Sequence, residues 1–94
     1  MENIIKFDLS KMGSLDIQSM HKVIDAYRFI DEPIVETGFN IMSGYVYIYL
    51  ESGISICSNF GQSVDYLVTD FETGEEHFFD TYDEAFYALE TTNL

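Results

Sequence analysis

Apolar and polar residues recur with different periods along this chain, and the periods predict the elements of an α+β fold. From Ile4 to Leu9 they alternate in steps of two, which predicts a half-buried strand. After a break at Gly13, apolar residues recur at helical spacing, with Ser14 as the expected N-cap and Asp16 in the first turn. Pro33 ends this helix. The apolar positions of the helix are Leu15, Met20, Val23, Ile24, Tyr27 and Ile30.

The middle of the chain is rich in β-forming residues that are separated by turn residues. A short strand is predicted over Ile34–Phe39, before a turn at Ser43-Gly44. Runs of strands without helices between them favour an antiparallel sheet over a parallel one. Four further strands are expected in sequence order, over Tyr45–Leu50, Ile54–Ser58, Val64–Phe71 and Glu75–Phe79.

A capping box begins the last predicted element, because Thr81 is followed three residues later by Glu84. Apolar residues then follow on one helical face, at Tyr82, Ala85, Phe86 and Leu89. The predicted fold is therefore α+β, an antiparallel sheet of about four to five strands with one N-terminal and one C-terminal helix. The 94 residues, 47% of them hydrophobic, suit a single domain over 1–94.

The size and distribution of the net charge are the most informative features for function. Seventeen acids against four Lys and Arg residues give a net charge of −13, whereas a small domain carries a magnitude of about 2–8. From Phe29 onward there are 13 acids and no Lys or Arg. Direct binding to nucleic acid or to an anionic membrane is disfavoured, because phosphate contacts need Lys and Arg. We interpret the asymmetry as a surface that meets a basic partner; the alternative is that it serves solubility alone. The bases are Lys6, Lys11, Lys22 and Arg28.

Motifs for catalysis or metal binding are missing from the sequence. His21 and His77 have no metal-ligand spacing, and Cys57, expected as a small core residue, cannot build a thiolate site alone. The acidic stretch from Asp70 is unlike an EF-hand, since its twelfth position is Thr81 where a glutamate is needed. No glycine-rich phosphate loop or nucleophile elbow occurs. We therefore expect no enzyme activity, no cofactor and no dedicated metal site.

The single cysteine rules out an internal disulfide and fits a reducing compartment. The first residues lack a basic region followed by a long apolar run, so no signal peptide is expected. The longest apolar run, Tyr45–Leu50, is far shorter than the roughly 20 residues that span a bilayer. These features predict a cytoplasmic protein.

Two groups of residues are candidates for binding a partner. Tyr45, Tyr47 and Tyr49 share one strand face, opposite an aliphatic face that suits the core. These tyrosines either lie beneath the first helix or form an exposed aromatic strip, which a second copy of the chain could also cover as a homodimer seam. The second group consists of carboxylates around the last hairpin and helix: Asp65, Asp70, Glu72, Glu75, Glu76, Asp80, Asp83 and Glu84.

These carboxylates, if they share an edge, would form a broad negative field. Duplex DNA carries about one charge per 1.7 Å of its axis, and its binding proteins meet it with grooves of Lys and Arg. A rigid acidic surface would offer such a groove a substitute for DNA. Binding would then be fast and sensitive to salt.

A small, strongly acidic chain that is rich in Ile, Tyr, Phe and Asp resembles phage-encoded inhibitors, particularly anti-CRISPR proteins and other DNA mimics. The segment Val64–Leu89 (strand, Thr-Gly turn, strand, Thr-x-x-Glu-Ala helix) is similar to a module of many small phage and bacterial proteins. The resemblance implies a non-enzymatic inhibitor that occupies a basic, nucleic-acid-binding or PAM-reading surface of a CRISPR effector nuclease in the host bacterial cytoplasm. The alternatives are an immunity protein against a basic nuclease toxin, and a phage structural or assembly protein that forms a homo-oligomer.

Overall fold

A five-stranded antiparallel sheet and two helices form the fold, which confirms the predicted α+β class. The computed structural model describes residues 7–70 and 72–91. In chain order the elements are η1 (Leu9–Lys11, a 3-10 helix), α1 (Ser14–Tyr27), β1 (Ile34–Asn40), β2 (Tyr45–Leu50), β3 (Ile54–Asn59), β4 (Asp65–Thr69), β5 (Glu76–Phe79) and α2 (Tyr82–Thr91).

The strands follow one another as a meander, since their order in the sheet is the order in the chain. Ile48 of β2 pairs with Ile56 of β3, and Ile56 pairs with Tyr66 of β4. Tight turns make this order accessible. The β2–β3 turn, for example, needs Gly53 at φ +101°, a value that L side chains rarely adopt, where its N–H bonds to the carbonyl of Leu50 at 3.0 Å.

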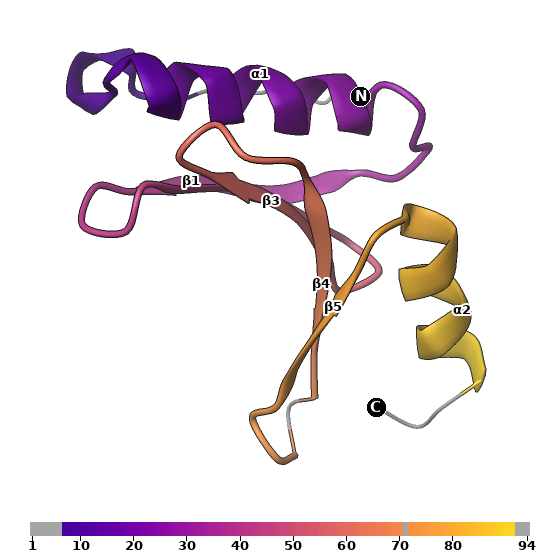
Figure 1. Ribbon diagram of the computed structural model, residues 1–94. Coiled ribbons are helices and arrows are strands. Elements are labelled where there is room, and N and C mark those ends of the chain that lie inside the picture. Colours follow the sequence, from indigo (N-terminus) through magenta and orange to yellow (C-terminus); the bar gives the residue numbers. More distant parts are fainter. Residues whose placement is uncertain (1–6, 71, 92–94) are drawn as a thin grey trace.

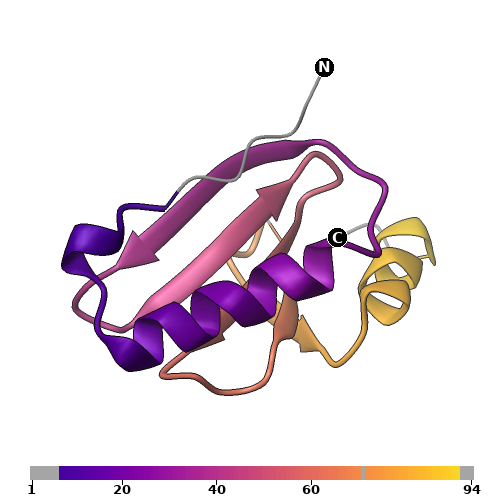
Figure 2. The same ribbon diagram turned by 90° about the horizontal axis from the view of Figure 1, so that it is seen from above.

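Both helices lie on the same face of the sheet (Figures 1 and 2). α1 packs across β2 and β3, and α2 packs across β4 and β5. The sheet twists strongly, so that the β4–β5 hairpin runs crosswise to β1 (Figure 1). The core between sheet and helices consists of Met20, Val23, Val46, Ile48, Leu50, Ile54, Ile56, Val68 and Ala85.

A small buried polar cluster fixes α1 on the sheet. The hydroxyls of Ser19 on α1 and Ser58 on β3 bond to each other at 3.2 Å. Ser58 also donates to the carbonyl of Gln62 at 2.6 Å, and Ser19 accepts the N–H of Gly61 at 2.8 Å. Because each buried hydroxyl has a partner, the cluster specifies the position of α1 without an unsatisfied polar group.

The N-terminal region differs from its prediction. Residues 4–6 of the predicted first strand lie outside the described residues, and Leu9 begins a 3-10 helix in place of extending a strand. The carboxylate of Asp8 accepts the N–H of Ser10 at 3.1 Å, and this local bond favours the turn over a strand.

The boundaries of α1 also differ from the prediction. Gly13 is the N-cap in place of Ser14, because the Asp16 carboxylate accepts the Gly13 N–H at 2.8 Å. The helix ends at Tyr27, three residues before the last predicted position, where the N–H of Ile30 turns back to the Tyr27 carbonyl at 2.9 Å. In α2, Phe86 is exposed although its spacing placed it on the apolar face.

Candidate functional site

The last third of the chain carries most of the negative charge. We call residues 65–91, which form β4, β5 and α2, the acidic unit. It contains nine acids and no Lys or Arg, a formal charge of −9. All of these acids are exposed except Asp70, which is partly buried. The nine are Asp65, Asp70, Glu72, Glu75, Glu76, Asp80, Asp83, Glu84 and Glu90.

The acids of this unit occupy three sides of it and do not form one row. One group surrounds the β4–β5 turn, and a second group opens α2 at the opposite end of β5, about 13 Å away for a four-residue strand. Asp65 and Glu76 lie instead on the sheet face that points away from both helices. The turn group is Asp70, Glu72 and Glu75, the helix group is Asp80, Asp83 and Glu84, and the ninth acid, Glu90, lies near the other end of α2.

Some of these carboxylates form hydrogen bonds or ion pairs with other residues of the chain. Asp70 accepts the N–H of Glu72 at 2.9 Å and therefore orders the turn. Thr81 is the predicted N-cap: its hydroxyl accepts the Glu84 N–H at 3.2 Å and bonds to the Glu84 carboxylate at 3.0 Å. Glu75 lies 3.7 Å from the imidazole of His77. The geometry thus leaves Glu72 as the exposed turn acid with the fewest contacts of its own.

We call the sheet face opposite the helices the open face, because no helix of the described residues covers it. The three tyrosines of β2 lie here, so of the two alternatives the one in which α1 covers them is wrong, whereas the aliphatic face of β2 is core as expected. The tyrosines are half-buried by their neighbours on the sheet. Tyr47 lies directly over Gly38 of β1, where a Cβ atom would collide with its ring, and donates to Glu36 at 3.0 Å.

On the open face, the acidic unit borders the rest of the sheet next to Tyr45 of β2 and Cys57 of β3. The Cys57 thiol donates to the carbonyl of Asp65 at 3.4 Å, and burial raises the thiol pKa to about 11. Burial and the hydrogen bond to Cys57 hold the pKa of Tyr45 well above its usual range, and Glu76 and Asp65 raise it further. A cavity of about 300 Å³ lies beside these groups. The fold therefore brings Asp65 and Glu76 close to Tyr45, the first tyrosine of the row.

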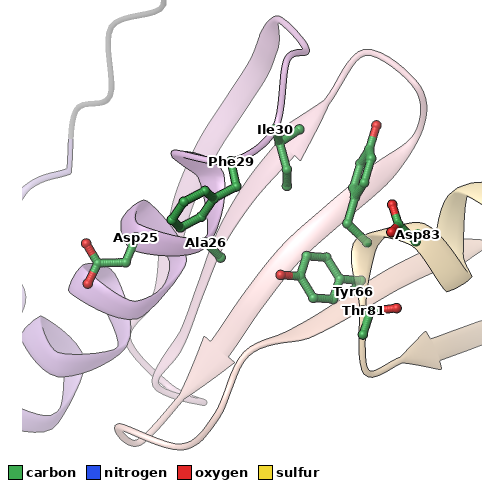
Figure 3. Close-up of a pocket in the computed structure, with 8 residues that line it drawn as sticks. Asp25, Ala26, Phe29, Ile30, Tyr66, Thr81 and Asp83 are labelled. Atoms are coloured by element: carbon green, nitrogen blue, oxygen red, sulfur yellow. The ribbon is translucent and has the colours of Figure 1, made fainter.

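A cleft of about 490 Å³ separates the end of α1 from the start of α2 (Figure 3). Its apolar wall includes Phe29, which is 92% exposed. Sequence reasoning missed this site, since its residues come from three distant segments. The available signal was the apolar pair that follows Arg28, of which Phe29 is exposed and Ile30 is partly buried. The cleft is lined by Asp25, Ala26, Phe29, Ile30, Tyr66, Thr81, Tyr82 and Asp83.

Glu32, in the loop between α1 and β1, joins three parts of the molecule. Its carboxylate accepts the N–H and the hydroxyl of Ser52 in the β2–β3 turn, at 2.8 and 2.9 Å. It also accepts the hydroxyl of Tyr82 on α2. Burial, and then this bond, raises the pKa of Tyr82 well above its usual range. Nothing in the sequence pattern singled out Glu32.

Metal binding finds no support in the part of the chain that the structure describes, where no three His, Cys, Asp or Glu side chains are arranged to hold an ion. His21 is exposed on α1, and His77 contacts Glu75 alone among the acids that the structure describes.

None of the helices in the described residues is long and apolar enough to cross a membrane.

Comparisons with protein families, with curated proteins and with solved structures gave no match for this chain. Its function therefore has to be argued from its own residues.

Proposed function

We propose that this protein is a non-enzymatic inhibitor whose acidic unit covers a basic, nucleic-acid-binding surface of a partner protein. The observation that carries the proposal is the charge of −9 on residues 65–91, with eight exposed carboxylates and no Lys or Arg to offset them. These acids lie on three sides of the unit, and the turn group and the helix group are the two concentrations of negative charge that attract the Lys and Arg residues that normally contact phosphates.

The described Lys and Arg residues lie outside this unit, in or next to η1 and α1. Lys22 on α1 donates to the carbonyl of Gly61 at 2.7 Å, and Arg28, at the end of the same helix, lies 3.6 Å from Asp25. Lys11 is in η1, before α1. The described cations thus belong to the α1 side, which would orient the molecule with its acidic unit toward a basic partner during encounter.

Exposed aromatic side chains accompany the acids. Phe78 on β5 and Phe86 and Tyr87 on α2 are all exposed. Aromatic residues are enriched in protein interfaces, where they supply a large contact area. Acids that steer the encounter and aromatic rings that pack in the complex suit a protein-binding surface better than one that serves solubility alone.

The partner class that fits both this chemistry and the resemblance to anti-CRISPR proteins is a CRISPR effector nuclease, bound at its DNA-binding or PAM-reading surface. A basic nuclease toxin presents a similar surface, so an immunity function would use the same acidic unit. The two differ in which basic protein the chain binds, and one experiment can include both partners.

The test is a pair of variants with equal charge change. E72K/E75K reverses two turn acids, whereas D31K/E51K reverses two exposed acids outside the acidic unit. We expect the native protein to block duplex binding by a purified effector–guide complex. E72K/E75K should weaken this block by about tenfold or more, since like charges at an interface cost several kcal/mol, while D31K/E51K should retain it.

Two results would contradict the proposal. One is an equal loss in both variants, because the acidic unit would then have no special part. The other is a mobility shift of duplex DNA by the native protein alone at physiological salt. Inhibition of a basic nuclease toxin, with no effect on any effector complex, would identify the immunity function instead.

A further inference from the structure

We propose that the cleft between α1 and α2 binds an arginine side chain of the basic partner. This inference rests on the proposed function, which requires a partner rich in Lys and Arg, and it names the contact that would anchor the complex. The cleft volume of about 490 Å³ lies within the range of roughly 300–1,000 Å³ that is usual for binding sites.

Two aromatic rings form a preorganised part of the cleft. The rings of Tyr66 on β4 and Tyr82 on α2 meet edge to face, with centroids 6.5 Å apart at 71°. The bond from Tyr82 to Glu32 holds that ring in place before any partner arrives. A guanidinium group stacks on aromatic faces, and its aliphatic stem suits the apolar wall formed by Ala26 and Ile30.

The hydroxyl of Tyr66 gives the cleft a free polar atom. Figure 3 shows Tyr66 between the end of α1 and the start of α2. The hydroxyl of its neighbour Tyr82 is already bonded to Glu32, whereas the Tyr66 hydroxyl has no hydrogen bond to any residue that the structure describes. It can therefore accept an N–H from a guanidinium group, which carries five donors.

Carboxylates flank the cleft on both helices. Asp83 lies on the α2 side, whereas Asp25 lies on the α1 side with its carboxylate directed away from Tyr66 (Figure 3). Arg28 lies 3.6 Å from Asp25 and offsets part of its charge. No Lys or Arg follows Arg28 in the sequence, so Asp83 has no such neighbour on its own element. Asp83 is thus the stronger attraction for an incoming cation. Arginine suits this geometry better than lysine, because one planar group can stack on a ring and bond to a carboxylate together.

The test uses small probes with the full-length protein. Labelled protein is titrated with acetyl-arginine amide, acetyl-lysine amide or acetyl-leucine amide and followed by NMR. We expect the arginine probe to give saturable shifts at the cleft residues with millimolar affinity. The lysine probe should bind several-fold more weakly, and the leucine probe should leave these signals unchanged. Stronger binding of the leucine probe would make the cleft an apolar anchor and overturn the proposal, as would arginine shifts that centre on the β4–β5 turn.

Variants then assign the contacts. D83N should weaken arginine binding about three- to tenfold, whereas E90Q, the same charge change near the other end of α2, should leave it unchanged. Y66F keeps the ring and removes the hydroxyl, so its expected several-fold loss tests the hydrogen bond even if D83N disturbs α2. Equal affinity in the native protein, D83N and Y66F would overturn the proposal.

The cleft and the proposed function can fail separately. If the arginine probe binds the cleft but no effector or toxin is inhibited, the function is wrong and the site remains. If E72K/E75K abolishes inhibition while the probe never binds the cleft, the acidic unit acts without this anchor.

Discussion

Two regions of the molecule make different contributions: one supplies most of the buried core, and the other carries most of the negative charge. The helix α1 and strands β1–β3 supply most of the core, with eight of the eleven buried hydrophobic side chains that the described residues contain. The acidic unit supplies the other three, Leu67, Val68 and Ala85. Its charge is −9, whereas residues 1–64 carry 8 acids and 4 bases, or −4. Self-repulsion is thus concentrated where the fewest apolar side chains are buried, and the other region serves as the scaffold.

The two regions are nevertheless joined. Val68 and Ala85 belong to the same core cluster as Val23 and Ile48. Glu32 bonds to the β2–β3 turn and to α2 together. The acidic unit therefore holds its shape through contacts with the scaffold, as the function that we propose requires.

The largest predicted effect is on the free energy of unfolding, when a buried aliphatic side chain is shortened in the scaffold or in the acidic unit. Ile48 is fully buried under α1, and Leu67 is 8% exposed on the open face. Substitution of a buried aliphatic side chain by alanine costs about 2–5 kcal/mol. We expect I48A near the upper end of this range and L67A near the lower end, as measured by urea denaturation. An equal or larger loss for L67A would show that the acidic unit contributes as much to stability as the scaffold.

The next prediction tests the link between the regions. E32Q keeps the shape of the side chain but removes the charge that Tyr82 and Ser52 bond to, so unfolding should become easier by about 1.5–3 kcal/mol. E51Q, a nearby exposed glutamate, is the matched control and should change stability by less than about 0.5 kcal/mol.

A double-mutant cycle of E32Q with Y82F should give a coupling energy of about 0.5–3 kcal/mol, because the two side chains share one bond. Additive effects would mean that α2 is held by its apolar contacts alone.

The smallest predicted effect is the change in stability with pH that comes from Cys57, at the seam between β2 and the acidic unit, and it occurs only at alkaline pH. Its folded pKa of about 11 exceeds the ordinary value of 9.0. Because the folded protein keeps the thiol protonated to higher pH than the unfolded chain does, the raised pKa stabilises the fold. This stabilisation is complete below pH 9 and is lost as the pH rises toward 11. Burial also raises the pKa of Tyr45, Tyr47 and Tyr66, which adds to the loss in the same direction.

Two measurements check this. The urea midpoint should stay constant from pH 7 to 9 and fall above it. Ellman's reagent at pH 8 should react slowly with the folded protein and rapidly once urea unfolds it, since the thiolate is the nucleophile. Rapid reaction of the folded protein would contradict the burial of this thiol.

Local patterns predicted the elements well where the physical cause is local. Alternation over Tyr45–Leu50 identified the strand and its aliphatic core face, and Thr81 caps α2 as its spacing from Glu84 indicated. The predictions failed where a nearby polar side chain redirected the backbone, as Asp8 and Asp16 do before and at the start of α1. Charge counting identified the acidic residues, but not their division among the turn, the helix and the open face.

The sequence by itself determined the α+β class, the meander of strands and the lysine-free acidic stretch, since these depend on period, turn residues and composition. The tertiary structure alone decided that both helices share one face, which leaves the tyrosine row uncovered. It also decided that Glu32 and Tyr82, fifty residues apart, bond to each other and that a cleft opens between α1 and α2. Such contacts depend on strand twist and helix packing, which no local pattern encodes.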